Sequence, residues 1–139
     1  MRRQYEFIKK RKNDEAFLQE MVCRWLDSKG ILYIASLMGV NLGVRVGSIR
    51  KRMGCRAGTP DLLILKPAGK YHGMTLELKV KGGHITDEQN SFANLAKDNG
   101  YYAVIMPPKF ELMEALDWVK KEVEFYLQSI QEEKWVIQK

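Results

Sequence analysis

Two apolar segments joined by a short turn constrain the fold of this 139-residue chain more than any other feature. Residues 61–65 (DLLIL) and 74–80 (MTLELKV) have the composition of strands, and the intervening PAGKYHG is rich in residues that form turns. Because so short a connection brings neighbouring strands back side by side, we expect the two to pair as an antiparallel hairpin.

Periodicity and composition place the other elements. Apolar residues at helical spacing predict helices over residues 14–29, 87–99 and about 110–130, with Thr86 and Gln89 as a capping box before the second. Further strands are expected over 31–37 and 101–106, the latter parallel to its neighbour because a helix precedes it. The order is α-β-β-β-α-β-α, an α/β fold with a central mixed β-sheet flanked by helices. Helical spacing also assigns Trp25, Phe92 and Trp118 to the core.

The connection over residues 38–59 is glycine-rich and basic, with at most a short helical turn near residues 48–53. The chain has a net charge of +6, and the excess lies in two segments, residues 1–12 and 45–56. The first is equally well explained as a solvated terminal arm. The second lies mid-chain among glycines, so we expect it to contact nucleic acid phosphates. The DNA-binding candidates are Arg45, Arg50, Lys51, Arg52, Arg56 and Lys81.

Several protein classes are excluded. No apolar run approaches the roughly 20 residues that a membrane-spanning helix needs, and the basic N-terminus lacks the apolar stretch of a secretory signal. The two cysteines, Cys23 and Cys55, have no neighbouring Cys or His, so neither a disulfide framework nor a zinc finger is supported. We therefore expect an intracellular protein without a membrane partner.

Acidic side chains mark one end of the hairpin. In a strand, Glu77 and Lys79 lie on the same face, and hairpin pairing brings Asp61 beside Glu77. Two adjacent carboxylates repel one another unless a cation such as Mg²⁺ or Mn²⁺ lies between them, which predicts a metal site. Lys79 could then orient or deprotonate a water molecule or stabilise charge on a phosphate. Glu77 and Lys79 alone would equally fit a solvent-facing ladder of mixed charge.

Two further candidates have simpler explanations. A glutamate in a first helical turn, such as Glu15, is favourable for the helix dipole wherever it points. Gln89 is explained by the capping box, and it can also serve the site only if its side chain turns toward the acidic residues.

The combined pattern resembles the VRR-NUC (virus-type replication-repair nuclease) domain of the PD-(D/E)XK nuclease superfamily. The resemblance covers about residues 13–127 and is carried by Glu15, RAGTPD at residues 56–61, Glu77-Leu78-Lys79 and TDEQ at residues 86–89. It implies a restriction-endonuclease-like fold, with Asp61, Glu77 and the Leu78 carbonyl as metal ligands. It also implies Lys79 as the catalytic lysine, Gln89 as support for the active site and Glu15 as part of the acidic cluster.

The resemblance further implies a compact, stand-alone phage or bacterial enzyme that acts in a bacterial or phage-infected cell. Such members resemble homodimeric endonucleases that cut branched DNA, including four-way (Holliday) junctions, in repair and recombination. Residues 13–130 would form the nuclease domain, between a basic N-terminal arm (1–12) and a C-terminal tail (131–139). Two alternatives stay open: a nuclease acting on flaps, single strands or duplex DNA, and a non-catalytic module that binds nucleic acid.

Overall fold

The computed structural model describes residues 14–36 and 43–137, with side chains as far as residue 128. The expected N-terminal arm, residues 1–12, lies outside the described residues. Within them the chain forms, in order, α2 (Asp14–Ser28), β1 (Tyr33–Ala35), α3 (Val44–Arg52), β2 (Leu62–Ile64), β3 (Met74–Glu77), α4 (Asp87–Asp98), β4 (Tyr102–Ile105) and α5 (Leu112–Ile137).

The four strands form one mixed sheet in the order β1-β2-β3-β4. β2 pairs with β3 in an antiparallel register that sets Leu62 opposite Leu76, which confirms the predicted hairpin. β1 adds to the other side of β2 in antiparallel orientation. β4 pairs with β3 in parallel, as the helical crossover through α4 requires. The sheet is therefore the mixed α/β sheet that the sequence predicts.

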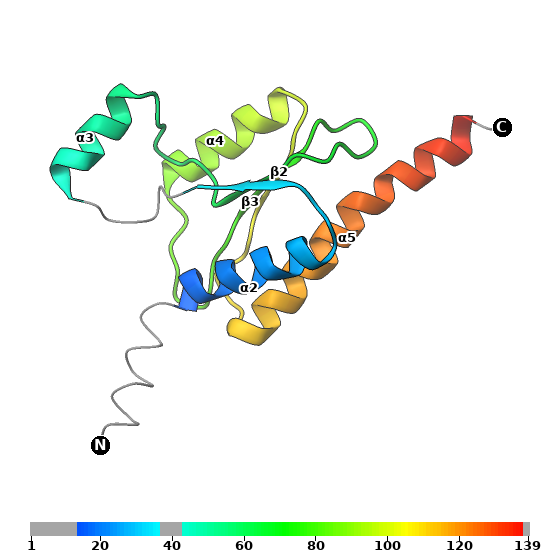
Figure 1. The fold of residues 1–139 in the computed structure, drawn as a ribbon, viewed down its shortest axis with the longest axis horizontal. Coiled ribbons are helices and arrows are strands. Elements are labelled where there is room, and N and C mark those ends of the chain that lie inside the picture. Colours follow the sequence, from blue (N-terminus) through cyan, green and yellow to red (C-terminus); the bar gives the residue numbers. More distant parts are fainter. Residues whose placement is uncertain (1–13, 37–42, 138–139) are drawn as a thin grey trace, which may run out of the picture.

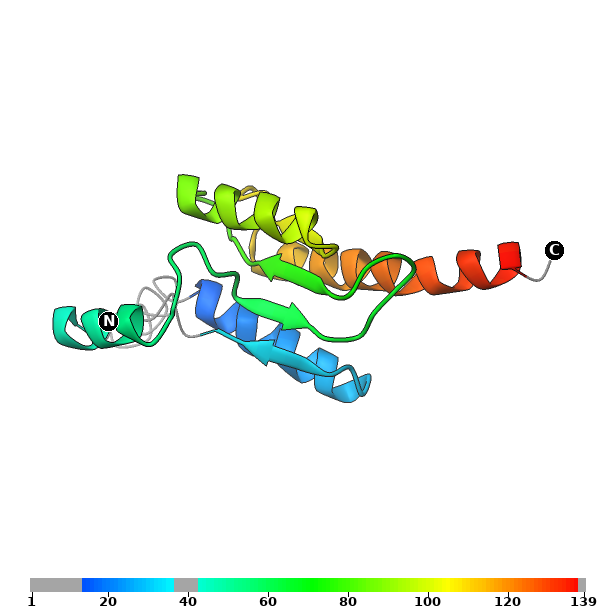
Figure 2. The same cartoon turned by 90° about the horizontal axis from the view of Figure 1, so that it is seen from above.

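Helices cover the two faces of the sheet unequally. α2 and α5 pack side by side on one face, and α4 lies on the other, against β3 and β4 (Figures 1 and 2). The core lies on the two-helix face and is built from alternate strand residues and one stripe of each helix: Leu18, Val22, Leu26, Leu62, Ile64, Met74, Leu76, Val119, Val123 and Tyr126 are fully buried. Trp25 and Trp118 pack against this core, as expected.

The connection between β1 and β2 contains more regular structure than expected. α3 runs over nine residues, Val44–Arg52, where only a helical turn near residues 48–53 is predicted, so the observed order is α-β-α-β-β-α-β-α. No residue of α3 is buried, and α3 stands apart from the rest of the fold in both views (Figures 1 and 2). Because α3 has no buried face, its sequence lacks the apolar periodicity that predicts a helix packed on a core.

Other boundaries also move. The strands are three or four residues long, shorter than the predicted ranges, because pairing ends where the connections diverge. α5 continues to Ile137 instead of ending near residue 130, since residues 131–137 contain good helix formers and no glycine or proline. No helix within residues 14–36 and 43–137 is both long and apolar enough to span a membrane.

Gly58, in the loop after α3, packs against the start of α4. Its φ of 78° lies in the left-handed region, and a Cβ built on it would lie 2.1 Å from the backbone oxygen of Glu88. Gly54, earlier in the same loop, also has positive φ (91°), but nothing lies within 4 Å of its Cβ position. Only glycine therefore allows the chain before Asp61 to contact the first turn of α4.

Gly58→Ala is expected to destabilise the protein more than its matched control, Gly54→Ala. The control carries only the cost of a left-handed backbone, about 1–2 kcal/mol. Gly58→Ala also forces backbone apart, so we expect a loss of about 3 kcal/mol in the free energy of unfolding, measured by urea denaturation. Equal losses in the two variants would show that the contact with α4 does not matter.

Candidate active site

Three carboxylates converge at one end of the hairpin. Asp61 immediately precedes β2 and Glu77 ends β3, and extending the pairing of Leu62 with Leu76 by one residue sets these two acids opposite each other. Glu15, from the first turn of α2, joins them from the adjacent layer. One oxygen from each of the three side chains lies within 4.8 Å of the others.

Hydrogen bonds fix two of these carboxylates. The Leu78 backbone N–H donates to Oδ2 of Asp61 at 2.7 Å, and Gln89 Nε2 donates to Oε1 of Glu77 at 2.8 Å. The same Gln89 side chain accepts the Thr86 N–H through Oε1 at 3.0 Å, while the Gln89 N–H donates to Thr86 Oγ1 at 3.2 Å. The predicted capping box is thus confirmed, and Gln89 caps its helix and holds Glu77 at once.

Lys79 lies beside the carboxylates and away from solvent. Its Nζ is 3.8 Å from Oε1 of Glu77, and both residues are only 5% exposed. A solvent-facing ladder of mixed charge, the simpler interpretation of these two residues, is therefore wrong. Negative charge is costly in a place with so little solvent, and the positive charge of Lys79 offsets part of that cost.

Burial and mutual repulsion disfavour the negatively charged form of these carboxylates. Desolvation, followed by the nearby charge of Asp61, raises the pKa of Glu77 from 4.5 to about 8, although Lys79 acts in the opposite direction. Burial likewise raises the pKa of Asp61 and of Glu15. Among the buried polar side-chain atoms of the described residues, Oε2 of Glu77 has no hydrogen-bond partner. The cluster therefore holds oxygen ligands that its own donors do not satisfy.

The oxygen ligands of this cluster fit a hard divalent cation. Clustered carboxylate oxygens are the ligands that Mg²⁺ and Mn²⁺ prefer, and the unpartnered Oε2 of Glu77 is the kind of atom such an ion would satisfy. Glu15, Asp61 and Glu77 are the side chains that would hold it. The Leu78 carbonyl ligand and the catalytic roles of Lys79 and Gln89 stay predictions.

The predicted DNA-binding residues lie mostly on one projecting structure. Arg45, Arg50, Lys51 and Arg52 belong to α3, and Arg56 follows in the next loop. We call α3 with the loop to residue 57 the basic arm. All of these side chains are exposed except that of Arg50, which is half-buried. Lys81 lies beyond β3, exposed, with its Nζ 3.5 Å from Oε1 of Glu111.

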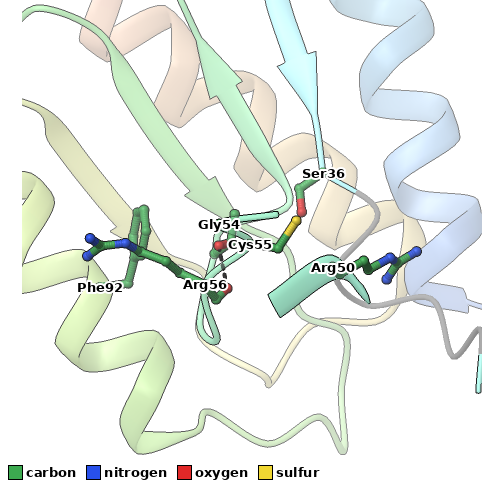
Figure 3. Close-up of a pocket in the computed structure, with 7 residues that line it drawn as sticks. Ser36, Arg50, Gly54, Cys55, Arg56 and Phe92 are labelled. Carbon is green, nitrogen blue, oxygen red and sulfur yellow. Dashed lines mark hydrogen bonds between the residues drawn. The ribbon is translucent and has the colours of Figure 1, made fainter. Parts of the chain in front are cut away.

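The sequence-based assignment of Phe92 to the core is wrong. Phe92 is half-buried, is not part of the core cluster and lines a surface pocket with Cys55 and Arg56 (Figure 3). An apolar residue at helical spacing gives the same signal whether it faces the core or a pocket. Its position three residues after Gln89, and so on the same helix face, was the available clue.

Residues 43–107 match the model of the VRR-NUC domain family. The chain therefore resembles the VRR-NUC domain family over these residues. A solved structure described as a VRR_NUC domain protein superposes with a TM-score of 0.62 and is 27% identical, over 82% of this chain and 88% of that one. No curated protein matches the chain.

A VRR-NUC domain implies a nuclease of the PD-(D/E)XK type, and nucleases of this family act on DNA. The matched residues 43–107 include the basic arm, Asp61, Glu77, Lys79 and Gln89. Glu15 lies outside the match, and its place in the cluster rests on the geometry of the three carboxylates.

Glu77→Gln is expected to flatten the pH dependence of stability in metal-free protein. The Glu77 carboxyl has a pKa of about 8 when folded against 4.5 otherwise, so the folded state binds its proton more tightly. Stability of the parent should then fall as pH rises from about 5 to about 8 and level off above. Urea denaturation with EDTA across this range, beside the exposed Glu114→Gln as control, measures the difference. Parallel curves for parent and Glu77→Gln would contradict the assignment.

Proposed function

We propose that this protein is a divalent-metal-dependent endonuclease that hydrolyses phosphodiester bonds in branched DNA, four-way junctions above all, as a homodimer. The observation that supports it most is the cluster of the half-buried Glu15 and Asp61 with the buried Glu77, and the buried Lys79 beside it. Charged side chains with a purely structural role at the surface would have no reason to gather with so little access to solvent.

The residues divide the chemistry among them. A bound Mg²⁺ or Mn²⁺ would supply Lewis acidity that stabilises negative charge on the phosphate. Gln89 holds Glu77, and the Leu78 N–H holds Asp61, so neither ligand has to be ordered when substrate arrives. Lys79, whose Nζ lies 3.8 Å from Glu77 Oε1, would supply positive charge near the phosphate while a water oxygen forms its bond to phosphorus and the bond to the leaving oxygen breaks.

DNA would be held through its backbone. The basic arm presents Arg45, Lys51, Arg52 and Arg56 to solvent, and such contacts bind phosphates without regard to sequence and weaken as salt rises. Specificity would then come from the shape of the DNA, which is what a branch point offers.

The homodimer is supported by the edge of the sheet. β1 is an edge strand, and beside its open edge Leu32 and Ile34 are 67% and 56% exposed. Two copies related by a two-fold axis would cover these residues with the same residues of the partner. The two active sites would then lie at a fixed separation, which suits paired cuts across a junction.

Cleavage assays with single variants test the chemistry. Glu77→Gln should abolish cleavage of labelled DNA, and Lys79→Ala should slow it by about 10² to 10⁴-fold, while both retain binding. EDTA should stop the parent enzyme, and added Mg²⁺ or Mn²⁺ should restore it. Lys97→Ala, which removes an exposed lysine at the far end of α4, is the matched control. A parent protein that binds DNA but cuts nothing with either metal would establish the non-catalytic binding module instead.

Substrate choice and assembly are tested together. We expect symmetric cutting of a four-way junction in preference to a flap, a linear duplex and a single strand, and a solution mass twice the 16.1 kDa of the chain by light scattering. Ile34→Lys should yield monomers and uncoupled cuts. Met113→Lys, at an exposed position on α5, should leave the mass unchanged; disruption by this variant alone would move the interface to α5. Preferred cutting of flaps or strands by a monomer would keep the chemistry and replace the junction role.

A further inference from the structure

A pocket of about 410 Å³ lies between the basic arm, the end of β1 and α4. Its lining includes Ser36, Cys55, Arg56, Thr59 and Phe92. In Figure 3 Arg56 and Phe92 lie at one end of the pocket, and Arg50 lies at the other end with its guanidinium directed away from Phe92. The proposed chemistry makes no use of Phe92 or of this pocket.

The pocket adjoins the carboxylate cluster through two separate elements. Thr59 lies two residues before Asp61, and its hydroxyl donates to the Arg56 carbonyl at 2.6 Å, which holds the loop in shape. Phe92 lies one helical turn after Gln89, the residue that donates to Glu77. A group bound in the pocket would therefore be close to a phosphate held at the cluster.

The lining selects the chemistry of the occupant. Phe92 offers part of an aromatic face, Arg56 adds a planar cation to the same pocket, and no acidic residue is among the described residues that line the pocket. A neighbouring hollow shares Arg56 and Phe92 but is also lined by Asp87 and Glu88, whose charges would repel a phosphate chain. A flat, aromatic group attached to a polyanion suits the first pocket, and a nucleobase is such a group.

We propose that the pocket takes one unpaired nucleobase of the DNA, stacked on Phe92 beside Arg56, next to the phosphodiester at the carboxylate cluster. This inference rests on the proposed function and adds a cause for its preference for branched DNA over a continuous duplex. A base within a continuous duplex has to leave its stack to enter a pocket, whereas a base at a branch point is unpaired or readily unpaired.

The first test measures binding in protein that does not cleave. In a Glu77→Gln background with EDTA, Phe92→Leu should weaken binding to DNA with an unpaired nucleotide at a branch by about 5-fold to 150-fold, the range for loss of one stacked base. Affinity for a fully paired duplex should change by less than about twofold, and Phe92→Tyr should restore the branched-DNA affinity. A 2-aminopurine at the unpaired position should lose fluorescence on binding Phe92-containing protein and recover it with Phe92→Leu.

The second test leaves the pocket residues unchanged and measures how strongly DNA protects a cysteine in the pocket from alkylation. Cys55 is exposed and lines the pocket, while Cys23 is half-buried on α2 and serves as the reference. Branched DNA should protect Cys55 from N-ethylmaleimide, and the same DNA with an abasic site at the unpaired position should protect it several-fold less, as read by mass spectrometry.

Equal protection by the base-containing and abasic DNA, or equal loss of branched and duplex binding in Phe92→Leu, would overturn the proposal. Both tests measure binding, so they are independent of whether the parent cleaves. Failure of the endonuclease proposal would show as absent cleavage in the parent, and failure of this one would show as absent base dependence.

Discussion

The repulsion among three clustered carboxylates, one buried and two half-buried, is the constraint around which this structure is arranged. Glu15, Asp61 and Glu77 come from a helix, from the residue before one strand and from the end of another, and each sits where water cannot fully solvate its charge. Lys79, the Leu78 N–H and Gln89 offset part of that cost. Oε2 of Glu77 has no hydrogen-bond partner among the described residues. This unsatisfied oxygen is why the site suits a divalent cation.

The first turn of α4 is where several of these requirements meet. Gln89 uses one amide group to cap the helix and to hold Glu77, so the start of the helix and the position of the carboxylate are set by a single side chain. Gly58 brings the chain that leads to Asp61 against the same turn. Phe92, on the next turn, lines the pocket beside the site. One short helical segment thus relates the hairpin, the basic arm and the pocket.

Much of this arrangement could be predicted from the sequence, because it depends on short-range patterns. The period of two placed Glu77 with Lys79, the turn between residues 67 and 73 fixed the hairpin, and the capping box located α4. Glu15 is different, because its approach depends on how α2 packs across the sheet, and only the family resemblance supplied that. α3 and Phe92 were misjudged for one reason: apolar periodicity reports burial, α3 buries nothing, and Phe92 faces a pocket instead of the core.

Two glycines in the loop after α3 have opposite surroundings, with a mechanical consequence. Gly54 has open space around it, whereas Gly58 is held against the backbone of α4. A change in the angle of α3 would meet no steric obstacle at Gly54, whereas at Gly58, three residues before Asp61, it would meet the backbone of Glu88. Under the proposed function, the basic arm would adjust to DNA arms of different direction while the spacing of the carboxylates stays constant, so adaptability and precision would fall to positions only four residues apart.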